Sequence, residues 1–121
     1  MDRKILIVDD EPEVTGYLKT YFELQGVAVS TAATGEDALE ILASECPSLV
    51  LLDIRLGKGL SGIEVIRRAK QMKWSAEIIV LSALEDRNIM DLAKGLGASA
   101  YITKPIIIAE LERVVLSRLK P

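Results

Sequence analysis

Residues 4–12 read KILIVDDEP, and the order of residue types in this stretch indicates how the chain folds. The run Ile5–Val8 is continuously apolar, which is typical of a strand that is buried on both faces of a parallel sheet. Two acids, Asp9 and Asp10, follow the run, and Pro12 then stands where the first residue of a helix belongs. The stretch therefore predicts a buried strand, an acidic turn and a helix.

Further β-branched apolar runs recur at near-regular intervals and predict additional strands. With Lys4–Asp9, the predicted strands are Val27–Ala33, Ser48–Asp53, Glu77–Ser82 and Ser99–Thr103. Polar residues Ser30 and Thr31 interrupt the second run, so we expect that strand at an edge of the sheet.

Segments with the apolar spacing of helices lie between and after these strands. The first starts at Pro12 and stops by Gly26. The second is capped by Thr34 and closed by Pro47, the third runs from about Ser61 to Met72, and the fourth runs from near Glu85 to before Gly97. The fifth contains Leu111, Val114, Val115 and Leu119.

The strict alternation of predicted strands and helices, joined by short links, predicts a flavodoxin-like, doubly wound α/β fold. We expect one domain over residues 1–121, with five helices and a five-stranded parallel sheet in the order 2-1-3-4-5.

Composition excludes several kinds of chemistry. The 121 residues contain no histidine and one cysteine, Cys46, so a Ser-His-Asp triad, a phosphohistidine relay and a histidine-bound zinc are impossible within them. A pI of about 5.0 and few aromatic residues argue against direct nucleic-acid binding. The longest near-apolar stretch, Ile78–Leu84, is too short for a membrane span. We therefore expect a cytoplasmic protein.

Chemically distinctive residues follow four of the predicted strands. They are Asp9 and Asp10, Asp53, Ser82 and Lys104. Ligands of such sheets bind beyond the carboxyl ends of the strands. Three carboxylates gathered there favour binding of a hard cation, namely Mg²⁺, for which Mn²⁺ can substitute. With Lys104 and Ser82 available to phosphoryl oxygens, the pattern predicts a phosphoryl-accepting site.

Each residue also has a plainer interpretation when it is taken alone. Asp9 and Asp10 suit the N-terminus of a helix, and Asp53, Ser82 and Lys104 suit turns or caps. Their joint position at the ends of four strands favours a site. The stretch GKGLSG at 57–62 matches a dinucleotide-binding glycine pattern, but no acid stands about 20 residues beyond it, so we expect only a flexible loop.

The motifs ILIVDDEP, LVLLDIRL, IIVLSA and GASAYITKP together resemble the receiver domain of two-component response regulators, from Lys4 to about Leu119. The resemblance implies that Asp53 accepts a phosphoryl group from a histidine on a partner sensor kinase or phosphotransfer protein. It implies that Asp10 binds Mg²⁺ directly, Asp9 mainly through water, and Arg55 through its backbone carbonyl.

The resemblance also assigns the switch. Lys104, whose bond to Pro105 is cis in relatives, would neutralise charge, Ser82 would move toward the phosphoryl group, and Tyr101 would rotate inward. The fourth helix, fifth strand and fifth helix would then control an effector or form a homodimer. Such a protein is no enzyme beyond its own phosphorylation and dephosphorylation. Tyr101 as a plain core aromatic is the alternative.

Three departures from the family pattern carry expectations of their own. The loop 54–62 has one extra residue, and Gly57 stands where proline is common. Leu84 is apolar and predicts slow self-dephosphorylation. Residues 106–108 are all isoleucine and predict at least one exposed apolar side chain, hence a dimer or partner contact. Two other classes stay open: a metal-dependent phosphatase with an aspartyl nucleophile, and a pseudo-receiver that acts only as an interaction module.

Overall fold

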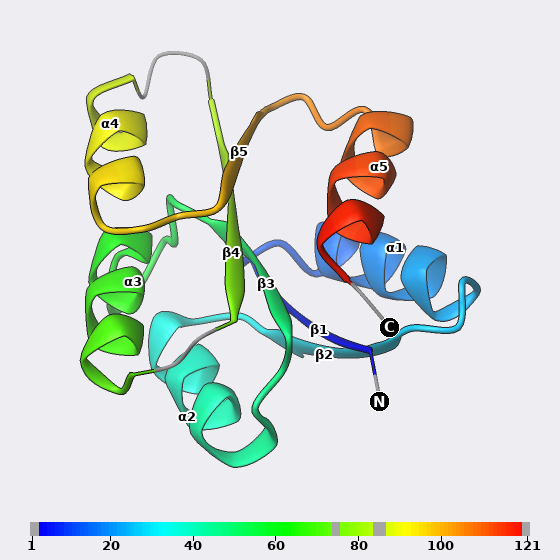
Figure 1. Cartoon of the computed structure of the whole chain (residues 1–121), viewed down its shortest axis with the longest axis horizontal. Coiled ribbons are helices and arrows are strands. Elements are labelled where there is room, and N and C mark those ends of the chain that lie inside the picture. The colour runs from blue at the N-terminus through cyan, green and yellow to red at the C-terminus, as the bar shows by residue number, and fades with distance from the viewer. Residues whose placement is uncertain (1–2, 74–75, 84–86, 120–121) are drawn as a thin grey trace.

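Strands and helices alternate along the whole chain (Figure 1), in a computed structural model that describes residues 3–73, 76–83 and 87–119. The strands are β1 (Lys4–Val8), β2 (Ala28–Ala32), β3 (Leu49–Asp53), β4 (Glu77–Ser82) and β5 (Ala100–Thr103). The helices are α1 (Pro12–Glu23), α2 (Gly35–Glu45), α3 (Gly62–Gln71), α4 (Arg87–Gly95) and α5 (Ile108–Arg118). The predicted start of the fourth helix near Glu85, and Leu84 before it, lie outside the described residues.

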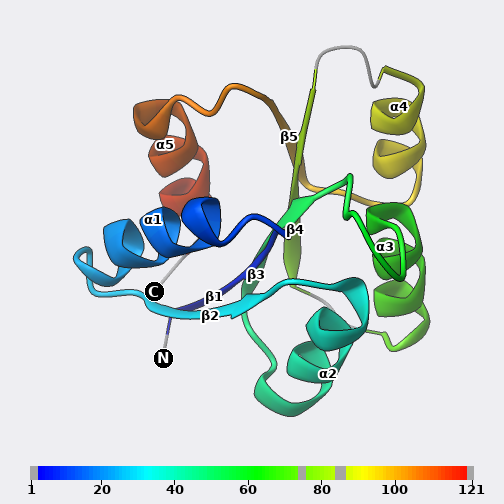
Figure 2. The ribbon, with the colours of Figure 1, turned by 180° about the vertical axis from the view of Figure 1, so that it is seen from behind.

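The strands form one parallel sheet in the order β2-β1-β3-β4-β5, which confirms the predicted topology and the edge position of β2. Helices α1 and α5 cover one face of the sheet, and α2, α3 and α4 cover the other (Figures 1 and 2). This two-sided cover is the reason that the central strands are apolar without alternation.

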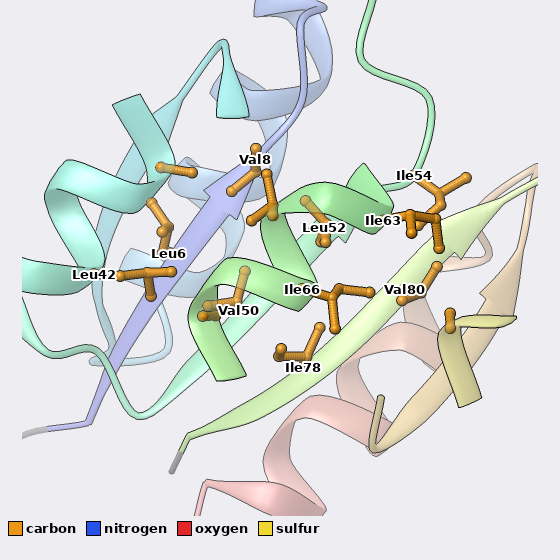
Figure 3. Packing of buried hydrophobic residues seen from close by; sticks show 14 of the residues in the cluster. Leu6, Val8, Leu42, Val50, Leu52, Ile54, Ile63, Ile66, Ile78 and Val80 are labelled. Atoms are coloured by element: carbon orange, nitrogen blue, oxygen red, sulfur yellow. The ribbon is translucent and has the colours of Figure 1, made fainter. Parts of the chain in front are cut away.

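Successive residues of β1 pack into different apolar clusters. Ile5 and Ile7 pack with side chains of α1 and α5, whereas Leu6 and Val8 pack with those of α2 and α3. Figure 3 shows the second cluster, with apolar side chains of α2 and α3 among those of β1, β3 and β4. The two clusters hold the sheet from both sides and leave its carboxyl edge for polar residues.

Local sequence signals set the starts of three helices. Pro12 is the first residue of α1. The Thr34 hydroxyl accepts a hydrogen bond from the Asp37 N–H at 3.1 Å, and the Ser61 hydroxyl accepts one from the Glu64 N–H at 3.1 Å. These caps confirm the predicted starts of α2 and α3, because each satisfies a backbone donor of the first turn that has no partner within the helix.

As expected, the three consecutive isoleucines at 106–108 do not all face the core, but the reason is not the helical period on which the expectation rests. Helix α5 begins at Ile108, so Ile106 and Ile107 precede it, and the backbone of Ile107 is extended. Ile106 and Ile108 pack against the cluster beneath α1 and α5, whereas the side chain of Ile107 is 61% exposed. The extended backbone of Ile107 just before the helix, rather than the period of a helix, directs its side chain outward.

None of the helices in the described part of the chain has both the length and the apolar character that crossing a membrane requires.

Candidate functional site

The strand register brings the predicted polar residues to one edge of the sheet. Val8 pairs with Leu52, so the next residues along β1 and β3, Asp9 and Asp53, come side by side. Asp53 itself pairs with Leu81, one residue before Ser82. The Lys104 N–H then donates to the Ser82 carbonyl at 2.7 Å, which aligns the end of β5 with the end of β4. Parallel pairing therefore assembles this edge from four separate strand ends.

Lys104 points back across this edge toward the acids. Its Nζ donates to Asp53 Oδ2 at 3.1 Å and lies 3.8 Å from Asp9 Oδ2. The Lys104–Pro105 peptide bond is cis, as the resemblance implied. The lysine and two of the predicted acids are thus in contact.

Four carboxylates converge beside the lysine. Oxygens of Asp9, Asp10, Glu11 and Asp53 all lie within 4.8 Å of one another. Asp9 and Asp53 are 2% and 4% exposed, whereas Asp10 and Glu11 are exposed to solvent. Glu11 was not among the predicted ligands. Its place directly after the two aspartates was the available signal, and the turn after β1 brings it into the cluster.

The ionisation of Asp9 reflects this crowding. Burial raises the pKa of Asp9 to about 6. The Glu11 N–H, which donates to Asp9 Oδ1 at 2.9 Å, lowers this pKa, and so does the positive charge of Lys104. The negative charges of Asp53 and Glu11 raise it. The carboxylate form of Asp9 is therefore less favoured here than that of an exposed aspartate, and an added positive charge would favour it.

Lys104 responds in the opposite direction. Burial alone would lower its pKa, but the hydrogen bond to Asp53 and the negative charges of Asp53, Asp9 and Glu11 outweigh burial and raise the pKa. Lys104 therefore remains an ammonium at neutral pH and supplies a fixed positive charge beside Asp53.

The donor set fits a hard divalent cation. Asp9 Oδ2 is buried and has no hydrogen-bond partner among the described residues, although the Lys104 ammonium lies 3.8 Å away. All the converging ligand atoms are carboxylate oxygens, which Mg²⁺ prefers over nitrogen or sulfur donors. The cluster can accordingly hold a metal ion.

Of the remaining predicted residues, Arg55 and Ser82 lie at the same edge, whereas Tyr101 lies within β5. The Arg55 N–H donates to Asp53 Oδ1 at 3.1 Å, two residues past the acid. Ser82 is buried at the end of β4. Tyr101, paired with Val80 in the sheet, is half-buried against the cluster that α4 covers, and its hydroxyl has no hydrogen-bond partner within the described segments. The structure thus places all seven predicted site residues, and their chemical roles are taken up below.

The loop between β3 and α3 differs from the flexible loop that its glycines suggested. The Gly57 N–H donates to Asp10 Oδ2 at 3.0 Å, and the Leu60 N–H donates to Glu36 Oε1 at 3.3 Å. The Gly62 N–H donates to the Ile54 carbonyl at 3.2 Å. Three hydrogen bonds therefore fix the loop to the rest of the protein. Gly57 contacts the Asp10 carboxylate, and this negative charge would repel the pyrophosphate of a dinucleotide.

Comparison with known sequences agrees with this geometry. A model of the response regulator receiver domain matches residues 5–116. The alkaline phosphatase synthesis transcriptional regulatory protein PhoP of Bacillus subtilis is 41% identical over 105 residues, which is 87% of this chain and 43% of PhoP. Sporulation initiation phosphotransferase F of the same organism is 36% identical over 115 residues, covering 95% of this chain and 92% of the relative. The chain therefore spans less than half of the first relative and nearly all of the second.

Solved structures have the same fold. A CheY-like receiver domain protein from Methanospirillum hungatei superposes with a TM-score of 0.92 at 28% identity, over 98% of this chain and 94% of that one. The BeF3-activated N-terminal receiver domain of RstA from Klebsiella pneumoniae gives 0.89 at 33% identity, over 98% and 100%. The chain belongs to the response regulator receiver domain family, and it is a signalling domain of two-component systems rather than a classical enzyme.

Proposed function

We propose that Asp53 accepts a phosphoryl group from a phosphohistidine on a partner protein and that the phosphoaspartate is the signal. The observation that carries this proposal is the Lys104 ammonium 3.1 Å from Asp53 Oδ2, beside the cluster of four carboxylates. The relative of nearly equal length is named a phosphotransferase, which supports a role in phosphoryl transfer.

The transfer needs a nucleophile, a donor and neutralisation of charge. A carboxylate oxygen of Asp53 forms a bond to phosphorus while the P–N bond to the donor histidine breaks, and the electron pair of that bond stays on the imidazole nitrogen. The sequence contains no histidine, so the donor lies outside these 121 residues, on a sensor kinase or phosphotransfer protein. Lys104 holds its charge beside the acceptor and stabilises the phosphoryl oxygens.

The acidic cluster supports a metal-dependent reaction. In our proposal Asp10, Asp53 and the Arg55 backbone carbonyl hold Mg²⁺, or Mn²⁺ in its place, and Asp9 acts mainly through water. When bound, such a cation neutralises the negative charge of the carboxylates and of the incoming phosphoryl oxygens.

Ser82 and Tyr101 are the proposed switch. The Ser82 hydroxyl moves toward the phosphoryl oxygens, and Tyr101, whose hydroxyl lacks a partner among the described residues, rotates inward. This change alters the face formed by α4, β5 and α5, which then engages an effector or a second copy of the chain. Attack of water on phosphorus breaks the P–O bond to Asp53, restores its carboxylate and releases inorganic phosphate.

We further propose that residues 1–121 act as a single domain in the cytoplasm. A phosphohistidine formed from ATP would be available there, and a reducing compartment suits the exposed thiol of Cys46.

Intact-mass spectrometry tests the acceptor. The chain is incubated with acetyl phosphate, with and without Mg²⁺, beside Asp53→Asn and the control Asp91→Asn, which changes an exposed acid of α4. We expect one added phosphoryl group, dependent on Mg²⁺, in the wild type and Asp91→Asn and none in Asp53→Asn. Continuous release of phosphate from varied substrates would instead indicate a phosphatase, and complete inertness an interaction module.

A further inference from the structure

The segment 57–60 of the β3–α3 loop lies between two acidic side chains. At one end, the Gly57 N–H donates to Asp10 Oδ2 at 3.0 Å, and at the other, the Leu60 N–H donates to Glu36 Oε1 at 3.3 Å. Glu36 belongs to the first turn of α2 and is not one of the four converging carboxylates. A short piece of backbone therefore connects a helix outside the cluster to one of the cluster's carboxylates.

Glycine favours both contacts, for different reasons. A Cβ atom at Gly57 would stand 2.6 Å from Asp10 Oδ2, so a side chain here would push the Asp10 carboxylate away from its observed position. Gly59 has a φ of +72°, and a Cβ there would stand 2.6 Å from Glu36 Oε2. Segment 57–60 thus forms a turn whose shape fits the two carboxylates.

The base of the loop is also fixed. The Gly62 N–H donates to the Ile54 carbonyl at 3.2 Å, and a Cβ at Gly62 would lie 2.7 Å from the Ile54 carbonyl oxygen. The base of the loop is thus closed, and displacement of segment 57–60 away from Asp10 and Glu36 would break the hydrogen bonds at Gly57 and Leu60. The hydrogen bond at Glu36 opposes that movement.

Asp10 depends on this contact for its orientation. Its side chain is exposed, so packing does not hold the carboxylate in one rotamer. One N–H on Oδ2 orients the group and leaves Oδ1 available to a cation. Partners of this kind commonly change metal affinity by about 10- to 100-fold. Proline, which is common at this position in the family, has no N–H and cannot make the bond.

We propose that Glu36 and the backbone of Gly57 form a clamp that orients the Asp10 carboxylate for the metal ion, which makes Glu36 a positioning residue. The inference rests on the proposed function, because it assumes that the acidic cluster binds Mg²⁺. Glu36 acts through Leu60 and Gly57 rather than on the metal itself. Its effect is therefore a change of affinity and not a loss of the site.

A Mg²⁺ titration of the full chain, followed by ¹⁵N NMR, tests the clamp. Glu36→Ala removes the acceptor of the Leu60 N–H, Glu36→Gln keeps an acceptor oxygen, and Asp37→Ala removes a neighbouring acid of the same helical turn. We expect the Kd for Mg²⁺ to rise about tenfold in Glu36→Ala, at the lower end of the usual range because the action is indirect. Glu36→Gln and Asp37→Ala are expected to stay within about twofold of the wild type.

Amide hydrogen exchange in metal-free protein provides a readout that needs neither Mg²⁺ nor phosphorylation. The amides of Gly57 and Leu60 are expected to exchange faster in Glu36→Ala than in Asp37→Ala, whereas both variants keep the same melting temperature within a degree or two. Equal exchange and equal Kd in the two variants would overturn the clamp.

The outcomes distinguish a failure of the clamp from a failure of the proposed phosphoryl-accepting function. A wild-type chain that is phosphorylated at Asp53 but shows no difference between Glu36→Ala and Asp37→Ala refutes the clamp alone. A wild-type chain that shows no Mg²⁺-dependent shifts refutes both. Weakened Mg²⁺ binding in Glu36→Ala with rescue by Glu36→Gln supports the clamp, whatever the phosphoryl donor is.

Discussion

Lys104 Nζ lies 3.1 Å from Asp53 Oδ2 and thereby joins the end of β5 to the end of β3 across β4. The backbone of Lys104 is held by the Ser82 carbonyl of β4, so the lysine's position depends on three strands. The same ammonium lies 3.8 Å from Asp9 Oδ2. One ammonium group therefore partly offsets the charges of two buried carboxylates.

Replacing Lys104 by methionine is expected to slow phosphoryl transfer to Asp53. The change keeps most of the apolar stem and removes the positive charge that stabilises the phosphoryl oxygens. Because Lys104 is partly exposed, we expect a loss of roughly tenfold to a hundredfold, at or below the usual effect of a single donor in an active site. The rate of adduct formation from acetyl phosphate measures it. Lys94→Met, on exposed α4, is the control; equal rates in the two variants would remove Lys104 from the mechanism.

Replacing Asp9 by asparagine is expected to stabilise the metal-free protein. Burial and neighbouring acids raise the pKa of Asp9 to about 6, so keeping Asp9 ionised at neutral pH costs the folded state more free energy than the unfolded state. A shift of about two pKa units corresponds to about 3 kcal/mol as an upper bound. Asparagine keeps an oxygen for the Glu11 N–H and carries no charge. Urea unfolding in the presence of EDTA at pH 7 measures the gain.

The gain from Asp9→Asn has a defined pH dependence. Between the ordinary pKa of an aspartate and about 6, the folded state binds more protons at Asp9 than the unfolded state, so the wild type loses stability as pH rises through this window. The difference between the variant and the wild type is therefore expected to be small near pH 4 and constant above about pH 7. A difference that does not change with pH, or one matched by Asp91→Asn, would show that the charge of Asp9 is not its cause.

Mg²⁺ is expected to stabilise the folded chain. At ten times its Kd, a ligand that binds only the folded state adds about 1.4 kcal/mol to the free energy of unfolding. Protons compete for Asp9 below about pH 6, so Mg²⁺ affinity is expected to be about tenfold weaker at pH 5 than at pH 7. Thermal unfolding with increasing MgCl2 tests both statements. If NaCl at matched ionic strength stabilises equally, the effect is screening and not binding.

Leu84 lies outside the described residues, and the expectation for it comes from the sequence. An apolar side chain two residues past Ser82 would exclude water from the phosphoaspartate and slow its hydrolysis. Leu84→Ala is therefore expected to shorten the lifetime of the phosphorylated chain several-fold. Loss of the adduct is followed by mass spectrometry after removal of acetyl phosphate. An unchanged lifetime would contradict this role.

Ile107 offers a test of the partner surface. Its side chain is 61% exposed at the start of α5, so Ile107→Ser is expected to change the free energy of unfolding by less than about 0.5 kcal/mol. If the isoleucine contributes to a dimer, beryllofluoride should raise the solution mass of the wild type and not of Ile107→Ser. A monomeric mass with and without beryllofluoride would be evidence against the dimer, and would leave an effector as the proposed partner.

Much of the fold was predictable from local patterns. The apolar runs of β1, β3 and β4 correctly predicted strands covered on both faces, and Thr34 and Ser61 correctly marked helix starts. These features depend on a few consecutive residues, since burial and capping act over one strand or one turn. The sequence predicts that at least one isoleucine of residues 106–108 is exposed, and Ile107 is; helix periodicity does not explain this, because the backbone of Ile107 is extended.

The order of the strands and the residues at their ends could be predicted from the chain alone. The way in which the loop after Asp53 is held, and the extent to which the pKa of Asp9 is raised, could not. The Gly57–Asp10 and Leu60–Glu36 hydrogen bonds join residues 47 and 24 positions apart. The pKa of Asp9 depends on its burial and on Asp53, which belongs to another strand. Such contacts act through space between separate elements, so they exist only once the sheet and its helices have packed.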